Sequence, residues 1–398
     1  MDLIIQPGKL SGNLSVIPSK SQAHRLLICA AFADGATELY CPEVNRDMAA
    51  TAACLNALGA DIQRTDNGYH IEPVREISAS AVLPCRDSGS TLRFLLPVVG
   101  ALGVDAVFQM EGRLAQRPLS PLWEEMVRMG CNLSFIDKQQ LRCSGKLKSG
   151  IFLIHGGVSS QFITGLLLAT ALIPGKSSIV ITGKLESRPY VDMTRHALAT
   201  FGCDSENFTV LGGKKLHTPG QMKVEGDWSN GAFFLAANSL GSYVQIDNLS
   251  EDSLQGDRAI TWLLPMLKSN CTISAADIPD LVPILSIAAA CNKGAVFTDI
   301  GRLRLKESDR VASIITMLHS LGGKAEATES TLAIYGTGLS GGTVDCVNDH
   351  RIAMAAAIGA TVCRNKVRLL GAECVEKSYP KFFEEYRRLG GNYEQYLR

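Results

Sequence analysis

The sequence predicts a mixed α/β (α+β) protein of two similar halves, each built from three copies of one supersecondary unit. Six times, a short β-like run ends in a small or charged cluster and opens an alanine- and leucine-rich helical stretch. The equivalent polar positions at these six helix starts are Ser19, Ser88, Ser159, Ser229, Asp280 and Asp349. Their successive separations are 69, 71, 70, 51 and 69 residues, and such a period indicates a stacked repeat.

Two kinds of helix are expected in each copy. The first kind is apolar nearly all round, which predicts burial, and lies within residues 14–31, 81–97, 152–172, 222–237, 271–290 and 343–360. The second kind has apolar residues three apart followed by a glycine, which predicts a more exposed helix with a C′ glycine, at 55–59, 126–130, 198–202, 318–322 and 386–390. Residues 261–273 resemble a degenerate sixth copy without the glycine. Short strand-like runs often follow, so each unit is roughly βαβαββ.

Composition narrows the class of protein. A chain of 398 residues exceeds the usual size of a single core, so two domains are expected. Its 39 basic and 39 acidic residues cancel, so no global field favours nucleic acid or an anionic membrane. Twelve irregularly spaced cysteines without a CxxC pair, and a start unlike a signal peptide, predict reduced thiols in a soluble cytosolic protein.

Basic side chains gather at the helix starts and in a few other short motifs. A helix N-terminus offers unpaired N–H groups and a positive dipole end, and arginine forks bind carboxylate or phosphate. Any one cluster alone also fits an ordinary N-cap or a solvated charged stretch. Their recurrence in several copies favours a site for more than one anion. The basic residues of these clusters are Lys20, Arg25, Arg93, Arg113, Arg117, Arg188, Arg302, Arg304, Lys306, Arg310, Arg351 and Lys377.

Familiar cofactor and nucleophile motifs are not found. Gly175–Ser177 resembles the end of a P-loop, but the position of the earlier glycine is occupied by Thr170. The sequence has no GxGxxG after a strand, no HExxH and no GxSxG. Nothing in the sequence therefore indicates a nucleotide loop, a metal ion or a serine nucleophile.

The ordered motifs resemble those of the 5-enolpyruvylshikimate-3-phosphate synthase family. They are SKSxxxR, SGSTxR, RLxxRP, SSQF, SRPYxD, VEGDxS, IPD, RLxxKESDR, NDHRxAM and KSYPxFF. The resemblance implies an inside-out α/β barrel of three βαβαββ units in each of two domains linked by a two-strand hinge. It implies one domain at 1–17 plus 224–398 and a second at 18–223.

The resemblance also implies an activity and a set of site residues. The reaction is transfer of the carboxyvinyl group of phosphoenolpyruvate to the 5-hydroxyl of shikimate 3-phosphate through a tetrahedral ketal, with release of phosphate, by a cytoplasmic monomer without a cofactor. Asp280 is implied as proton acceptor, with Glu307 and Lys20 as candidates for proton transfer at the methylene carbon. Ligands implied for shikimate 3-phosphate are Ser21, Arg25, Ser159, Ser160, Gln161, Ser187, Tyr190 and Lys306. Those implied for phosphoenolpyruvate are Lys20, Gly89, Arg117, Gln161, Arg310, Arg351 and Lys377, with Arg93 beside them.

Some positions depart from the family pattern, and two other functions stay open. Asp87 stands where asparagine is frequent, Ser90 where threonine is frequent, and Arg302 where some members have asparagine. One alternative is a UDP-N-acetylglucosamine enolpyruvyl transferase, and another is a non-catalytic repeat protein that binds anions. Asp280 and Glu307 favour an enzyme, because proton transfer requires carboxylates and anion binding alone does not.

Overall fold

The computed structural model describes residues 1–396, and its contacts divide the chain into two compact units. One, here the C-terminal unit, combines Met1–Ile17 with the chain from Gly226 onward; the other, the N-terminal unit, is Pro18–Glu225. The sequence analysis placed the second boundary between residues 223 and 224, two residues before the boundary in the structure. No helix in the described chain is long and apolar enough to cross a membrane.

The second repeat displays the βαβαββ order in full. Its sheet has the strand order β6-β7-β9-β8, with β6 and β7 parallel and the other neighbours antiparallel. The elements are β6 (Ser80–Arg86), α3 (Gly89–Leu102), β7 (Asp105–Met110), α4 (Leu122–Arg128), β8 (Cys131–Phe135) and β9 (Gln140–Gly145).

The fifth repeat, in the C-terminal unit, has the same topology. Its strand order is β15-β16-β18-β17, again with one parallel pair followed by antiparallel pairs. The elements are β15 (Thr272–Ser274), α9 (Val282–Ala290), β16 (Ala295–Thr298), α10 (Arg310–Ser320), β17 (Lys324–Ala327) and β18 (Thr331–Tyr335).

In the N-terminal unit, the first repeat takes its opening strand from the far end of the unit. That strand is β13, and it makes the order β13-β3-β5-β4, while the third repeat has the shorter sheet β10-β11-β12. The elements are α1 (Lys20–Ala31), β3 (Thr37–Tyr40), α2 (Arg46–Ala57), β4 (Asp61–Thr65), β5 (Gly68–Glu72), β10 (Ile151–His155), α5 (Ser160–Leu172), β11 (Gly175–Thr182), α6 (Arg188–Thr200), β12 (Thr209–Gly212) and β13 (Gln221–Lys223).

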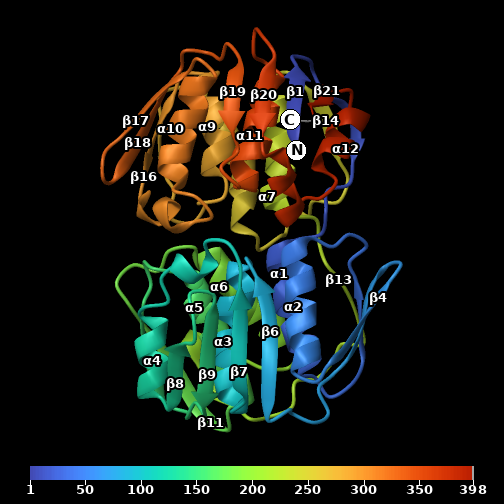
Figure 1. Cartoon of the computed structure of the whole chain (residues 1–398), viewed down its shortest axis with the longest axis vertical. Helices are drawn as coiled ribbons and strands as arrows, with labels where there is room; N and C mark the ends of the chain where they lie inside the picture. The colour runs from blue at the N-terminus through green and yellow to red at the C-terminus, as the bar shows by residue number, and fades with distance from the viewer. Residues whose placement is uncertain (397–398) are drawn as a thin grey trace. The chain divides into compact units, whose positions relative to one another are not determined.

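In the C-terminal unit, the start of the chain completes two repeats. The sheets are β14-β2 for the fourth repeat and β19-β20-β1-β21 for the sixth (Figure 1). The elements are β1 (Asp2–Gln6), β2 (Ser11–Leu14), α7 (Trp228–Ser239), β14 (Tyr243–Ile246), α8 (Ile260–Met266), β19 (Gly342–Asp345), α11 (His350–Ala360), β20 (Val367–Leu370), α12 (Phe382–Arg388) and β21 (Asn392–Tyr396).

The two kinds of helix behave as their sequences predict. Every residue of α9 and of α11 is buried, whereas α4 buries only Leu122, Glu125 and Met126. The glycines after the second helix of five repeats all have positive φ, which fits a C′ position; they are Gly59, Gly130, Gly202, Gly322 and Gly390. Helix α8, the degenerate copy, ends at Met266 without such a glycine.

All six predicted positions lie at a helix entry, but two of them are not the N-cap. The cap of α7 is Asp227, whose side chain accepts from the Asn230 N–H, so Ser229 lies inside the first turn. Helix α9 begins at Val282 after Leu281, and Asp280 lies one residue before that cap. The side chains of Ser229 and Asp280 are instead used in contacts with other segments, described below. Ser19, Ser88, Ser159 and Asp349 are caps as expected.

Candidate active site

In the N-terminal unit, three serines cap the three buried helices. The hydroxyls of Ser19, Ser88 and Ser159 accept from N–H groups in the first turns of α1, α3 and α5. Ser88, and not Asp87, therefore caps α3. A single hydroxyl satisfies only one of the four free N–H groups at a helix start, so the others remain available to an anion.

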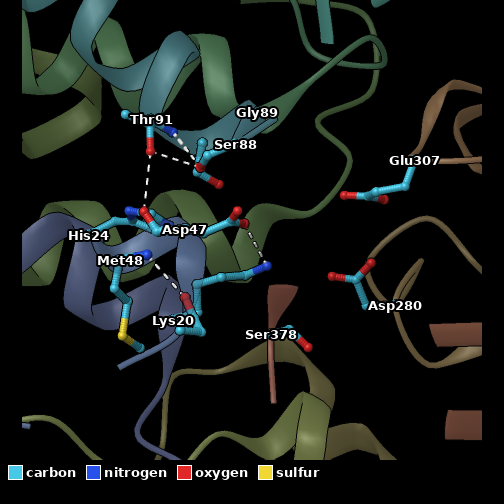
Figure 2. A network of polar contacts seen from close by, with 12 residues as sticks. Lys20, His24, Asp47, Met48, Ser88, Gly89, Thr91, Asp280, Glu307 and Ser378 are labelled. Carbon is cyan, nitrogen blue, oxygen red and sulfur yellow. Dashed lines mark hydrogen bonds and ion pairs between the residues drawn. The ribbon is translucent and has the colours of Figure 1, made fainter. Parts of the chain in front are cut away.

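Lys20, at the first position of α1, is paired with a carboxylate that the sequence analysis did not select. Its ammonium lies 3.0 Å from Asp47 Oδ2, and both side chains are largely buried (Figure 2). The second oxygen, Asp47 Oδ1, is buried and has no hydrogen-bond partner among residues 1–396. Asp47 lies in the first turn of α2, so the pair joins the two helices of the first repeat.

A buried chain of hydroxyls joins α1, α2 and α3 behind these helix starts. Thr91 Oγ1 lies 2.7 Å from both Ser88 Oγ and Thr51 Oγ1, and Thr51 Oγ1 lies 2.7 Å from His24 Nδ1. Figure 2 shows Thr91 between Ser88 and the backbone of Asp47. Burial, with Lys20 and Arg25 nearby, holds the pKa of His24 well below its usual value. His24 is therefore neutral, and its role is structural: it holds Thr51 through a hydrogen bond.

Arg25 uses most of its N–H groups in hydrogen bonds within the protein. The buried guanidinium donates to Thr194 Oγ1 at 2.8 Å, to the Tyr190 carbonyl at 2.7 Å, to Thr164 Oγ1 and to the Ser21 carbonyl. Four of the five N–H groups that arginine carries are thus used. In this arrangement Arg25 ties α1 to α5 and α6, and one N–H of Nη1 remains for a ligand.

Gly89, the first residue of α3, lies against two guanidinium groups. A Cβ built on it would lie 2.5 Å from Arg117 Nη1 and 2.9 Å from Arg93 Nη1. Arg93 is also held by the Gly89 and Pro118 carbonyls, at 3.4 and 3.1 Å. The missing side chain therefore lets two cations approach the start of α3, an arrangement suited to an anion.

The remaining predicted residues of this unit lie at the starts of α5 and α6. Gln161 Nε2 donates to Ser90 Oγ at 3.0 Å, which joins the start of α5 to the start of α3. Ser160 and Ser187 are buried, and Ser187 has a left-handed backbone (φ 54°) immediately before α6. Tyr190 lies in the first turn of α6 and offers its carbonyl to Arg25.

In the C-terminal unit, Arg310 is the centre of an ionic cluster. Its side chain is 1% exposed and lies 2.6 Å from Asp280 Oδ1, 2.9 Å from Glu307 Oε2 and 2.9 Å from Asp349 Oδ2. Both predicted carboxylates, drawn as sticks in Figure 2, are thus joined to one guanidinium. Ser308 Oγ, 3.0 Å from Asp349 Oδ2, adds a further bond. One buried guanidinium thus bridges three carboxylates, and removing any one of these partners would leave buried charge without compensation.

The cations around Asp280 determine its charge. Lys306 Nζ lies 3.5 Å from Asp280 Oδ1, and Arg351 Nη2 lies 3.9 Å from Oδ2. Burial raises the pKa of Asp280, but Lys306, Arg310 and Arg351 outweigh it and hold that pKa well below the usual value. Burial lowers the pKa of Lys306 to about 8, although Asp280 opposes the shift. Asp280 is therefore an ionised carboxylate when no ligand is bound.

The last two predicted cations lie in the sixth repeat. Arg351, in the first turn of α11, is 3% exposed and donates from Nη1 to the Ser229 carbonyl at 2.8 Å. Lys377 is buried at the end of the short helix η5 (Ala372–Lys377). The C-terminal unit thus brings together Asp280, Glu307, Lys306, Arg310 and Arg351 through ionic contacts of 2.6–3.9 Å.

The sequence analysis missed the partners that hold these side chains. Asp47, Thr51, Thr91 and Asp257 are buried residues that bond to predicted site residues or their neighbours. Asp349 was selected only as a repeat position. For Thr51 and Thr91 the sequence signal is a polar residue within a largely apolar helix, which does not identify the partner; Asp47 and Asp257 have no such signal.

The fold and these two clusters define a class: α/β repeat proteins that bind small anions through arginine, lysine and helix starts, with carboxylates set among the cations. Comparison with known proteins is more specific. Residues 4–386 match the family described as EPSP synthase (3-phosphoshikimate 1-carboxyvinyltransferase). The chain belongs to this family, as its motifs predict.

Individual proteins that are similar to this chain have names of the same kind. A 3-phosphoshikimate 1-carboxyvinyltransferase of Clostridium beijerinckii is 37% identical, with 99% of each chain covered, and that of Clostridioides difficile is 35% identical, with 99% and 98% covered. The fold is similar to that of EPSP synthase from Acinetobacter baumannii, with a TM-score of 0.81, 22% identity and coverage of 99% and 100%. It is also similar to that of the enolpyruvyl transferase NikO from Streptomyces tendae, with a TM-score of 0.77, 16% identity and coverage of 99% and 98%.

Proposed function

We propose that this chain is a transferase that moves the carboxyvinyl group of phosphoenolpyruvate to the 5-hydroxyl of shikimate 3-phosphate and releases phosphate. The observation that carries the proposal is the ionised Asp280 among Lys306, Arg310 and Arg351, in a chain that belongs to the EPSP synthase family. Both substrates carry phosphate and carboxylate groups, which guanidinium and ammonium groups bind. The reaction supplies aromatic amino acid biosynthesis.

The addition step assigns the proton transfers to three residues. Asp280 accepts the proton of the 5-hydroxyl while the hydroxyl oxygen forms a bond to C2 of phosphoenolpyruvate. Glu307 or Lys20 delivers a proton to the methylene carbon, which becomes a methyl group. The product of this step is a tetrahedral ketal whose carboxylate and phosphate lie among the cations.

Elimination then reverses the proton transfer at carbon. The methyl group loses a proton to the same donor, the C2–O bond to phosphate breaks, and the vinyl group is restored. The proton that Asp280 accepted leaves with the released phosphate, so every protein group returns to its starting state and the bond changes balance without a cofactor. When Arg310 turns from Asp280 to a substrate anion, Asp280 loses a neighbouring positive charge and becomes more basic than it is without ligand.

The binding roles follow the family motifs. Ser21, Arg25, Ser159, Ser160, Gln161, Ser187, Tyr190 and Lys306 are proposed for shikimate 3-phosphate. Lys20, Gly89, Arg93, Arg117, Gln161, Arg310, Arg351 and Lys377 are proposed for phosphoenolpyruvate. The cysteine usage supports a cytoplasmic location, and the family resemblance supports a monomer.

A phosphate-release assay with competing acceptors tests the proposal. Purified protein is incubated with phosphoenolpyruvate and either shikimate 3-phosphate or UDP-N-acetylglucosamine, and released phosphate is measured. Release only with shikimate 3-phosphate is expected. Release driven by the UDP-sugar would overturn the acceptor, and folded protein inactive with both would support a binding role alone.

A further inference from the structure

Asp257 is a wholly buried carboxylate for which the proposed reaction has no use so far. It lies in the short helix η3 (Gly256–Ala259) of the fourth repeat and is 0% exposed. One oxygen accepts a hydrogen bond from the Ser229 hydroxyl, whereas Oδ1 is buried without a hydrogen-bond partner in the described chain. Because burying a carboxylate is costly unless a positive charge or donors compensate, its surroundings require an explanation.

The segment that carries Asp257 is fastened to the start of α7. Gln255 Oε1 accepts from the Trp228 N–H at 3.0 Å, and Gln255 Nε2 donates to the Gly226 carbonyl at 2.8 Å. The bond from Ser229 to Asp257 is a third attachment. All three join residues 255–257 to residues 226–229, so the carboxylate cannot shift without disturbing the start of α7.

The start of α7 in turn holds Arg351. Within residues 1–396 the Arg351 guanidinium donates one hydrogen bond, from Nη1 to the Ser229 carbonyl at 2.8 Å, and its buried Nε has no partner. The guanidinium also contacts the Phe233 ring, whose centroid lies 5.8 Å from Cζ, and Asp280, whose Oδ2 lies 3.9 Å from Nη2. Asp280 is shared with Arg310 and Lys306, so it does little to fix Arg351.

Asp257 and Arg351, the two ends of this chain of contacts, also interact through their charges. Burial raises the pKa of Asp257 to about 7, Asp280 adds to the rise, and Arg351 opposes it. Attraction is mutual, so the carboxylate that Arg351 favours also stabilises the Arg351 cation where it stands.

We propose that Asp257 is a positioning residue for Arg351: it fixes Ser229 through the hydroxyl and holds the guanidinium, by charge and through the Ser229 carbonyl, in place to bind an anionic group of phosphoenolpyruvate. The proposal rests on the function proposed above. It gives the fourth repeat, for which the sequence analysis found no role in catalysis, a part in binding one of the two substrates.

Three variants test the chain of contacts. Asp257→Asn keeps an acceptor for the Ser229 hydroxyl and removes the charge, and Ser229→Ala removes the hydroxyl and keeps the carbonyl. Asp2→Asn is the matched control, because Asp2 is also a buried carboxylate of the C-terminal unit but pairs with Arg368 and the Gly371 N–H. Assays run at pH 8, where most Asp257 is ionised.

The expected result is a selective loss. Asp257→Asn and Ser229→Ala each raise KM for phosphoenolpyruvate roughly tenfold, as expected for loss of a contact to a charged group. The KM of the double variant for phosphoenolpyruvate stays within about twofold of that of the more impaired single variant, because both substitutions act through one chain of contacts. The Kd of shikimate 3-phosphate, measured by calorimetry without phosphoenolpyruvate, changes less than twofold, and Asp2→Asn changes neither constant.

Two results would overturn the inference. One is an unchanged KM for phosphoenolpyruvate in Asp257→Asn, or in Ser229→Ala where the first variant does not fold. The other is an equal weakening of the binding of both substrates, together with a lower urea concentration at the midpoint of unfolding. A purely structural role would give this result. Failure of the proposed function is distinct, since the wild-type protein would then release no phosphate in the presence of shikimate 3-phosphate.

Discussion

Lys306 provides a prediction whose sign and size follow from its surroundings. Its ammonium lies 3.5 Å from Asp280, its side chain is largely buried, and burial lowers its pKa to about 8. Replacement by arginine keeps a cation that stays protonated throughout the accessible pH range. If Lys306 binds shikimate 3-phosphate as a cation, affinity in the wild type should be nearly full at pH 7 and fall as the pH rises through 8, and the Lys306→Arg variant should not show the fall.

The size of the effect is set by the protonated fraction of Lys306. With a pKa of about 8, about 90% of the lysine is charged at pH 7 and about 10% at pH 9. Affinity should therefore decline about tenfold per pH unit above 8, and level off after a total loss of roughly 10–100-fold, the usual strength of a charged hydrogen bond. The ligand phosphate, with a second pKa of about 6, is already a dianion in this range and adds no slope of its own.

Calorimetric titration with shikimate 3-phosphate between pH 6.5 and 9.5, at constant ionic strength, measures the effect. Lys366→Arg is the control, because Lys366 is an exposed lysine of the same unit and its replacement should leave the wild-type curve unchanged. Equal slopes for the wild type and Lys306→Arg would refute the reasoning, since the titrating group would then be another one.

Three further outcomes are expected. Asp280→Asn should retain binding of both substrates yet lose about 10²–10⁴-fold in turnover, as for removal of a general base, and unchanged phosphate release would exclude Asp280 from that role. Gly89→Ala should raise KM for phosphoenolpyruvate about ten- to hundredfold, because its Cβ would displace the Arg117 and Arg93 guanidinium groups; an unaltered KM would contradict the packing at Gly89. Thr91→Val should lower the free energy of unfolding by about 1–3 kcal/mol in urea, because it leaves Ser88 and Thr51 without a buried partner, whereas a change under about 0.5 kcal/mol would show that this hydroxyl chain contributes little.

The repeat could be predicted because it depends on local chemistry. A serine or aspartate before an apolar stretch favours an N-cap, and a glycine favours the end of a helix, and four of the six helix-start positions are N-caps. The two that are not caps, Ser229 and Asp280, have a common cause. Each is a capping type of residue near a helix start, but Ser229 bonds to Asp257 and Asp280 pairs with Arg310.

The partners of the site residues could not be predicted, because they depend on how segments pack. Lys20 and Asp47 are 27 residues apart, Ser229 and Asp257 are 28 apart, and Arg310 and Asp349 are 39 apart. Nothing in the local pattern of Asp47 or Asp257 separates them from surface carboxylates. Only the fold reveals that they are buried, and burial makes their charges matter.

The position of β1 has a consequence for how the chain is made. This strand lies between β20 and β21, with Leu3 opposite Leu369, so its two partners are synthesised some 366 residues after it. At about 5–20 residues per second, it waits roughly 20–70 s on the ribosome without a neighbour. In the N-terminal unit the widest gap is shorter: β3 pairs with β13 through Glu38 and Gln221, which are 221−38 = 183 residues apart, and β3 already has β5 as an earlier neighbour. We therefore expect the N-terminal unit to fold first, while the apolar segment Leu3–Ile5 stays exposed until β20 and β21 are made and is open to capture by a chaperone or a neighbouring chain.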